Sequence, residues 1–255
     1  MRHTFQIDWI AIRELLYERV FYILLSFAAA ALALSLMLGQ MTYAEQAKLT
    51  LDFMLAGIEL SMILFSIFMG ISLFQRELSL GSISMVLSKP VSRASFILGK
   101  YLGQLAVQLG VTLLMGLFTA LVCMRFGSAV SFLSIFQTCL LIALEIAVLT
   151  AITYFFAVNA GAITTAVAAL AFFSIGHLEN TIADNVKYYA ENDVAWKAFE
   201  NLIPNLEVFN MKSLASYGLS IPWHQVGLAS LYAAICVVFY LVAASICFER
   251  KDILT

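Results

Sequence analysis

Long apolar runs alternate with short polar segments along most of the chain. Six runs approach the roughly 20 residues that a helix needs to cross the hydrocarbon core of a bilayer. They lie at 20–39, 53–74, 97–122, 132–157, 160–177 and 225–248. The runs are continuous and do not alternate with polar residues, which favours transmembrane helices over barrel strands. The pattern predicts an all-α membrane protein, a single domain over 1–255 with six transmembrane helices, of which the fifth is the shortest.

Three segments outside these runs are expected to be partly helical. Residues 1–19 carry an apolar stripe at helical spacing, which predicts a helix lying in the headgroup plane; a frayed start of the first transmembrane helix is the alternative. Residues 76–96 lie in a charged interruption that is long enough for a helix on the membrane face and a turn. Residues 178–223 mix acidic and aromatic residues at helical intervals and contain Pro204 and Pro222, which predicts a small helical cap.

The composition agrees with a chain surrounded by lipid. It is 62% hydrophobic and 12% charged, whereas soluble domains are about half apolar and a quarter charged. The net charge of −2 provides no basic surface for nucleic acid. The four cysteines lie in or beside apolar runs, and we interpret them as small apolar residues instead of disulfides or metal ligands. We recognise no cleavable signal peptide, because the first apolar run is about as long as a spanning helix.

Positive charge is unevenly divided between the segments that join the apolar runs. With the N-terminus in the cytoplasm, nine Lys and Arg residues fall inside and five outside, which matches the positive-inside rule. The inner set is Arg2, Arg13, Arg19, Arg76, Lys89, Arg93, Lys100, Arg250 and Lys251, and the outer set is Lys48, Arg125, Lys187, Lys197 and Lys212. Both termini are therefore predicted to be cytoplasmic, and 178–223 extracytoplasmic.

Motifs for enzymatic chemistry are missing from the sequence. It has neither a G-x-x-x-x-G-K-[ST] phosphate loop nor an H-E-x-x-H zinc motif. The histidines His3, His177 and His224 fall in different regions. His177 and Glu179 are neighbours at the expected outer membrane edge, and we interpret them as interfacial polar residues in preference to metal ligands. We therefore expect no catalytic residue, no metal and no cofactor in this chain.

Glu59 is the first of two acidic residues inside the apolar runs. It shares one helical face with Asp52, Ser66 and Gly70. A carboxylate at mid-membrane costs about 2.5–3.5 kcal/mol on insertion scales, so it is expected to face a partner helix or a cavity. For Glu59, which is nearer the outer surface, we prefer a hydrogen-bonded acid that ties helices together over a residue of a transport pathway.

Glu145 is the second intramembrane acid and lies near the middle of the fourth run. It shares a face with Ser134 and Thr138. A proton-linked pathway residue and a hydrogen-bonded acid that joins helices are equally consistent with this position.

The interruption at 74–103 has an ordered series of features. An acid, a glycine and an apolar run precede a Pro-Val-Ser-Arg turn and a Leu-Gly-Lys sequence at the foot of the next helix. The matching residues are Glu77, Gly81, Val86-Leu87-Ser88, Pro90-Val91-Ser92-Arg93 and Leu98-Gly99-Lys100. This series resembles the cytoplasmic loop of ABC-2 type ABC transporter permeases, although Leu78-Ser79-Leu80 makes it less charged than in many relatives. Residues 204–210 (PNLEVFN) and 248–252 (FERKD) provide two further matches, so that the resemblance extends over the whole chain.

The resemblance implies a membrane-spanning subunit without catalytic groups. Such permeases pair with a second copy or a paralogue in a bacterial-type inner (plasma) membrane, and ABC ATPase subunits bind ATP and Mg outside the permease. The implied ATPase-coupling residues are Glu77, Gly81, Ile83, Val86, Leu87, Pro90 and Arg93. Gly81 permits close approach, Pro90 marks a helix end, and the apolar residues between them suit a groove in another protein. A mere positive-inside anchor is the alternative for this loop.

The sequence leaves the substrate open. The apolar runs favour export of a hydrophobic or amphipathic substrate, and 178–223 is a candidate contact for a periplasmic partner. Basic residues of the inner loop, Lys89, Arg93 and Lys100, are expected to meet lipid phosphates. Two alternatives remain, namely a proton-coupled secondary transporter that uses Glu145 and a membrane scaffold that recruits extracytoplasmic partners.

Overall fold

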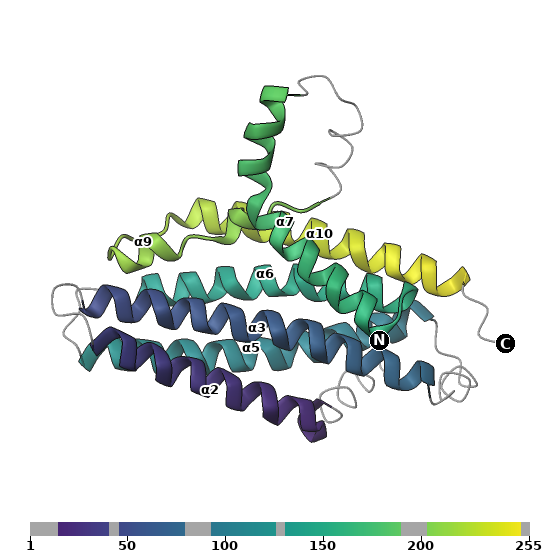
Figure 1. Ribbon diagram of the computed structural model, residues 1–255, viewed down its shortest axis with the longest axis horizontal. Coiled ribbons are helices and arrows are strands. Elements are labelled where there is room, and N and C mark those ends of the chain that lie inside the picture. The colour runs from purple at the N-terminus through teal and green to yellow at the C-terminus, as the bar shows by residue number, and fades with distance from the viewer. Residues whose placement is uncertain (1–14, 41–45, 80–92, 126–130, 190–202, 251–255) are drawn as a thin grey trace.

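The computed structural model describes residues 15–40, 46–79, 93–125, 131–189 and 203–250. Within these ranges the chain is mostly helical, with no strand. The elements are α2 (Arg19–Gln40), α3 (Gln46–Ser79), α5 (Arg93–Arg125), α6 (Phe132–Asn159), α7 (Ala162–Tyr189), the 3₁₀ helix η1 (Leu206–Phe209), α9 (Lys212–Ser216) and α10 (Trp223–Arg250). In Figure 1 the helices α2, α3, α5, α6 and α10 run side by side along the long axis of the molecule.

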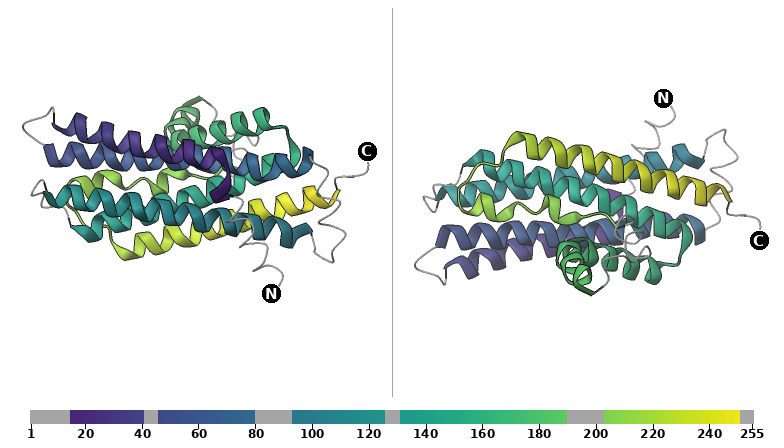
Figure 2. Two further views of the ribbon diagram at one scale, coloured as in Figure 1. Left: turned by 90° about the horizontal axis from the view of Figure 1, so that it is seen from below. Right: turned by 90° about the horizontal axis from the view of Figure 1, so that it is seen from above.

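Helix α6 is the centre of the bundle. It contacts α3, α5, α7 and α10, and 72% of its most apolar stretch is buried, as is 72% of that of α3. The corresponding share is 28% for α2 and for α10, which lie at opposite edges of the bundle in Figure 2. Exposed apolar side chains follow the outside of α10, among them Leu228, Leu231, Ile235, Val238, Phe239, Val242 and Ile246. Such a surface suits lipid and not water, so the protein is a multi-pass membrane protein.

Five of the expected transmembrane helices are confirmed by length and composition. They are Arg19–Leu38, Lys48–Phe74, Ala94–Met124, Phe132–Asn159 and Trp223–Glu249. The remaining expected helix, 160–177, corresponds to the apolar part of α7, Ala162–Leu178, which is shorter than the other five. The expectation of six full transmembrane helices is therefore met for five of them in the described part of the chain.

Between α6 and α10 the chain runs back along the bundle in two segments, the first half of α7 and residues 203–222. We call the two ends of the bundle the Arg19 end and the Gln40 end, after the first and last residues of α2. Helix α7 starts at the Arg19 end and packs on α3 and α6, and its second half then projects away from the other helices (Figure 1). Beyond α7, η1 lies on α6 and α9 contacts both α3 and α6, in the half of the bundle toward the Gln40 end. The first half of α7 and residues 203–222 thus cover the surface formed by α3 and α6, and we call them the two short segments.

The second piece, 203–222, packs into the bundle through both apolar and polar contacts. Leu206 and Phe209 are buried, with 0% and 1% of their surface exposed. From α6, Gln137 Nε2 donates to the carbonyl of Ile221 at 2.9 Å. A non-helical backbone is tolerated inside a membrane protein only where other groups satisfy its hydrogen bonds. Part of the predicted cap therefore lies against α3 and α6, because its apolar side chains and its carbonyls both find partners there.

Gly176 marks the closest approach between α7 and this second piece. A Cβ atom at Gly176 would lie 2.8 Å from Leu206 Cγ and 2.8 Å from the carbonyl oxygen of Pro204. We expect Gly176→Ala to lower the free energy of unfolding by about 1–3 kcal/mol, because backbone as well as side chain must move. Thermal unfolding of the purified protein in detergent measures this.

Gly227→Ala is the matched control for Gly176→Ala. Among the described residues, no atom outside the adjoining backbone of α10 itself lies within 4 Å of a Cβ placed at Gly227. Alanine there is expected to be neutral or to stabilise by about 0.5–1 kcal/mol, since glycine is a poor helix former. Equal unfolding temperatures for the two variants would contradict a close steric contact between residues 204–206 and α7.

Candidate functional site

His177 lies near the middle of α7, and both of its ring nitrogens face carboxylates. Nε2 lies 2.7 Å from Glu145 Oε1 of α6, and Nδ1 lies 3.0 Å from Glu207 Oε2 of η1. Glu59 Oε1 of α3 is 3.9 Å from the same Nε2. Four separate elements therefore meet at one imidazole ring, at the point where the two short segments adjoin.

Local structure of the segment around η1 orients Glu207 toward this ring. Asn205 is the N-cap of η1, and its side chain accepts a hydrogen bond of 3.0 Å from the backbone N–H of Glu207. Asn210 Nδ2 donates to Glu207 Oε1 at 2.9 Å, which leaves Oε2 for His177. An asparagine is a favoured N-cap because its side chain satisfies an otherwise unpaired helix N–H. The sequence around Glu207 thus fixes the position of its carboxylate.

Helix α9 attaches to α3 through two polar pairs. Lys212 Nζ forms an ion pair with Glu59 Oε2, and the Ser216 hydroxyl donates to the Asp52 carboxylate. Asp52 and Glu59 are seven residues apart, so they lie on one face of α3 two turns from each other. The expected helical face that carries Asp52 and Glu59 is therefore the face on which α9 packs.

Opposite charges within the cluster compensate one another in part. Glu59, Glu145 and Glu207 supply three carboxylates, against Lys212 and the ring of His177. The side chain of Glu145 is 1% exposed and that of Glu59 is 9% exposed. Because a buried charge without a partner is costly, loss of one member leaves another uncompensated.

The two contacts of His177 also require a shared proton. A neutral imidazole has a single N–H, so it can donate to only one of the two carboxylates. The second contact needs another hydrogen, either on the ring or on a carboxyl group. An imidazolium and a protonated carboxyl both satisfy the geometry, which makes the cluster suited to exchange a proton or to replace it with a cation.

A second group of buried polar side chains joins α3, α5 and α6. The hydroxyl oxygens of Ser66 and Thr150 are 2.8 Å apart, and Thr150 Oγ1 lies 3.1 Å from Gln108 Oε1. Gln104 Nε2 donates to the carbonyl of Ser66, and Tyr154 donates to Gln104 Oε1, both at 3.1 Å. Gln108 Nε2 is buried without a hydrogen-bond partner in the described part of the chain. These contacts hold the three helices in a fixed register.

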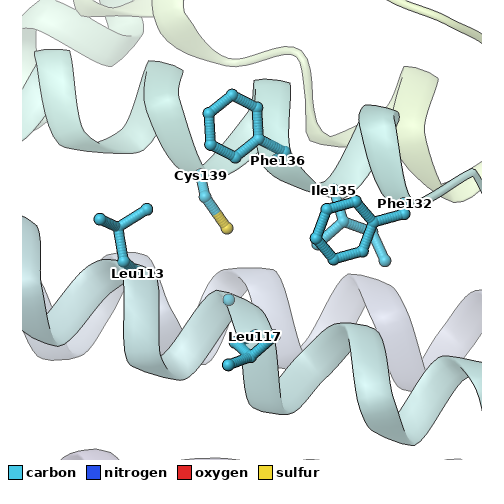
Figure 3. Close-up of a pocket in the computed structure, with 7 residues that line it drawn as sticks. Leu113, Leu117, Phe132, Ile135, Phe136 and Cys139 are labelled. Carbon is cyan, nitrogen blue, oxygen red and sulfur yellow. The ribbon is translucent and has the colours of Figure 1, made fainter.

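An apolar pocket of about 160 Å³ lies between α5 and α6 (Figure 3). Its lining residues are Leu113, Gly116, Leu117, Phe132, Ile135, Phe136 and Cys139. Gly116 lets the helices approach there, because a Cβ at this position would lie 2.6 Å from Cys139 Sγ. The described residues that line the pocket carry no charge, so it suits hydrocarbon better than a polar ligand.

The structure brings the two intramembrane acids predicted from the sequence into one cluster. Glu59 and Glu145 both have polar partners, as expected for carboxylates in apolar helices. The hydrogen bond between Glu145 and His177 suits both the pathway interpretation and the structural one.

The predicted coupling residues lie mostly outside the described residues. Glu77 belongs to the last turn of α3, and Arg93 is the first residue of α5. Residues 76–79 therefore continue α3 and do not begin a separate helix. The remaining coupling residues are Gly81, Ile83, Val86, Leu87 and Pro90, which fall in 80–92. Of the predicted interfacial helix at 1–19, only residues 15–19 are described.

Sequence reasoning missed three members of the cluster, His177, Glu207 and Lys212. In the sequence, Glu179 is the acidic neighbour of His177, whereas the partners of His177 in the structure are about 30 residues away on either side. The common depth of Glu59 and Glu145 follows from the helix starts in the structure: each residue stands 13 positions after the start of its helix, at Gln46 (59 − 46) and Phe132 (145 − 132). The expected start of the second helix at 53 concealed this common depth.

Comparison with known proteins identifies a family for nearly the whole chain. A family model described as "ABC-2 family transporter protein" matches residues 28–253. The match begins within α2 and ends after α10, so it includes every residue of the cluster. A comparison with curated proteins gives no match.

Proposed function

Since the chain belongs to the ABC-2 family of transporter proteins, we propose that this transmembrane permease couples ATP hydrolysis on a separate ATPase subunit to export of a substrate. The carrying observation is the family match over 28–253, which includes four helices of membrane-spanning length in full and part of a fifth, Arg19–Leu38. As a transport subunit, the chain is not itself catalytic. ATP and Mg would therefore be bound by the partner ATPase, and the role of this chain is to change shape when the ATPase does.

The coupling path that we propose runs through α3. Glu77 lies at one end of this continuous helix and Glu59 at about its middle. A helix of 34 residues is rigid enough to move as a unit over about 50 Å. Movement of the segment at 76–96 would reach the cluster around His177 through α3 and the adjoining α5. The segment between α7 and α10 is held to α3 by Lys212 and Ser216 and would follow.

Further features of the transporter follow from the family and the surface of the bundle. We propose a pair of permeases, either two copies or a copy and a paralogue, in a bacterial-type inner membrane with both termini cytoplasmic. A hydrophobic or amphipathic substrate is supported by the apolar pocket between α5 and α6. Residues 178–223 would face the periplasm, where part of this segment is available to a partner protein.

The first test is affinity purification from the native membrane followed by mass spectrometry of the proteins that accompany the chain. We expect an ABC ATPase in a fixed ratio to the permease. Glu77→Lys is expected to reduce the amount of ATPase at least tenfold or to uncouple hydrolysis from transport, because it reverses a charge at the end of α3. Gly81→Val should act in the same direction if the backbone approaches the partner closely.

Lys48→Glu is the matched control, because it reverses a charge near the opposite end of the same helix. The ATPase should remain bound to that variant. Absence of any ATPase under mild detergent, or its unchanged recovery with both Glu77→Lys and Gly81→Val, would contradict the proposed coupling.

Proton-coupled transport is the second candidate function. The observation that favours it is the buried contact between Glu145 and His177 at 2.7 Å, near the middle of α6. Transport would then be lost in Glu145→Gln and kept in Glu77→Lys, the reverse of what ATPase coupling predicts. A scaffold that recruits partners to 178–223 would tolerate both substitutions and an inactive ATPase.

A further inference from the structure

We propose that the protein binds one divalent transition-metal ion of the class of Zn²⁺ between Glu59 Oε1, Glu145 Oε1 and His177 Nε2. These atoms, from α3, α6 and α7, lie within 4.8 Å of one another. Zn²⁺ holds carboxylate oxygen and imidazole nitrogen at about 2.0–2.2 Å, so that two ligands of one ion are about 3–4 Å apart. The observed separations from Nε2, 2.7 Å to Glu145 and 3.9 Å to Glu59, bracket this spacing.

The side chains behind His177 support the ring as a metal ligand. A metal-bound histidine usually donates its second ring N–H to a carboxylate or carbonyl, which fixes the ring and its tautomer. Here Nδ1 lies 3.0 Å from Glu207 Oε2, and Asn210 holds the other oxygen of that carboxylate at 2.9 Å. With the hydrogen on Nδ1, Nε2 carries a lone pair that is available to an ion, and Glu145 Oε1 and Glu59 Oε1 lie 2.7 and 3.9 Å from it.

The charge of the site also suits a cation. Glu59 and Glu145 present two carboxylates in a buried setting, and the contacts of His177 need a shared proton that a divalent ion replaces. The mixed nitrogen and oxygen donor set favours a transition metal over Ca²⁺ or Mg²⁺, which prefer oxygen ligands. Lys212 pairs with the other oxygen of Glu59, Oε2, so it competes with the ion electrostatically without occupying the same atom.

An ion at this position would link several elements of the bundle. His177 is 18% exposed and Glu207 is 38% exposed, so the cluster opens on the side of η1. An ion bound there would join α3 and α6 directly to α7 and, through Glu207, to the segment that leads into α10. Metal binding should therefore hold the two short segments against the bundle.

The test is metal binding by the full-length chain, purified in detergent and freed of metal with a chelator. Isothermal titration with ZnCl₂ and elemental analysis after dialysis are expected to give one ion per chain. Cobalt provides a second measurement, because four-coordinate Co²⁺ in a protein site gives visible absorption bands that are much stronger and lie at longer wavelength than the weak band of aqueous Co²⁺. No ATPase is present in these experiments, so their outcome is separate from that of the proposed coupling.

Variants of the ligands and their supports distinguish this site from adventitious binding. His177→Ala and Glu145→Gln are expected to abolish the stoichiometric binding, and Glu207→Gln to weaken it about 10–100-fold, as supporting residues do. Lys212→Met is expected to tighten binding, because it removes the competing charge. His224→Ala, at an exposed histidine in the first turn of α10, is the matched control and should bind as the unmodified chain does.

If His177→Ala does not fold, Glu207→Gln still tests the proposal. Glutamine has nearly the same shape as glutamate, and Glu207 is not one of the three proposed ligands. The proposal is overturned by wild-type protein that takes up no Zn²⁺, or by uptake unchanged in Glu145→Gln and Glu207→Gln. Equal loss in His224→Ala, or equal binding of Ca²⁺, would likewise mean an adventitious ion only.

Discussion

Glu145→Ala is expected to lower the free energy of unfolding by about 3–5 kcal/mol, which is the usual cost of removing one partner from a buried charged pair. The carboxylate is 1% exposed and its oxygen lies 2.7 Å from His177 Nε2. Alanine leaves a ring nitrogen without its partner and a cavity in α6, which with α3 is one of the two most buried helices of the bundle. Chemical unfolding of the purified protein in detergent, followed by tryptophan fluorescence, measures the loss.

Two further variants identify the origin of this effect. Glu145→Gln keeps an oxygen that accepts from His177, so its cost should be clearly smaller than that of alanine. Glu249→Ala, at an exposed acid in the last turn of α10, should change stability by less than about 0.5–1 kcal/mol. A Glu145→Ala variant as stable as Glu249→Ala would show that the cluster does not hold the helices together.

The apolar pattern predicted the long helices well because lipid demands it. A continuous run of about 20 apolar residues has few alternatives to a transmembrane helix, and five of the expected runs agree with the structure. The face of α3 that carries Asp52, Glu59 and Ser66 was also predicted from helical periodicity. The structure places Ser216, Lys212 and Thr150 as their respective partners.

Two features escaped the sequence because they depend on tertiary contacts. The run at 160–177 is apolar enough to suggest a full transmembrane helix, but α7 leaves the bundle and Leu206 and Phe209 cover the adjoining surface instead. Periodicity reports which residues avoid water and does not report which segment covers them. The pairing of His177 with Glu145 and Glu207 similarly joins residues about 30 positions apart, and only the packing of α7 and η1 on α6 brings them together.

The ion pair between Lys212 and Glu59 should show strong coupling in a double-mutant cycle. Lys212→Met leaves the 9%-exposed Glu59 carboxylate without its cation, and we expect a loss of about 3–5 kcal/mol in the free energy of unfolding. Glu59→Gln should cost less, because Lys212 is 20% exposed and can turn its ammonium group toward water. Chemical unfolding of the two single variants and the double variant gives the coupling energy.

The double variant Glu59→Gln/Lys212→Met is expected to be more stable than the sum of the single losses by about 1–3 kcal/mol, since it removes both charges together. Asp52→Asn combined with Lys212→Met is the matched control, because Asp52 bonds to Ser216 and not to Lys212. Those two substitutions should be closer to additive. Additive losses in the Glu59–Lys212 cycle would contradict the view that this pair fixes α9 on α3, whereas strong coupling would identify it as the contact through which movement of α3 reaches the segment before α10.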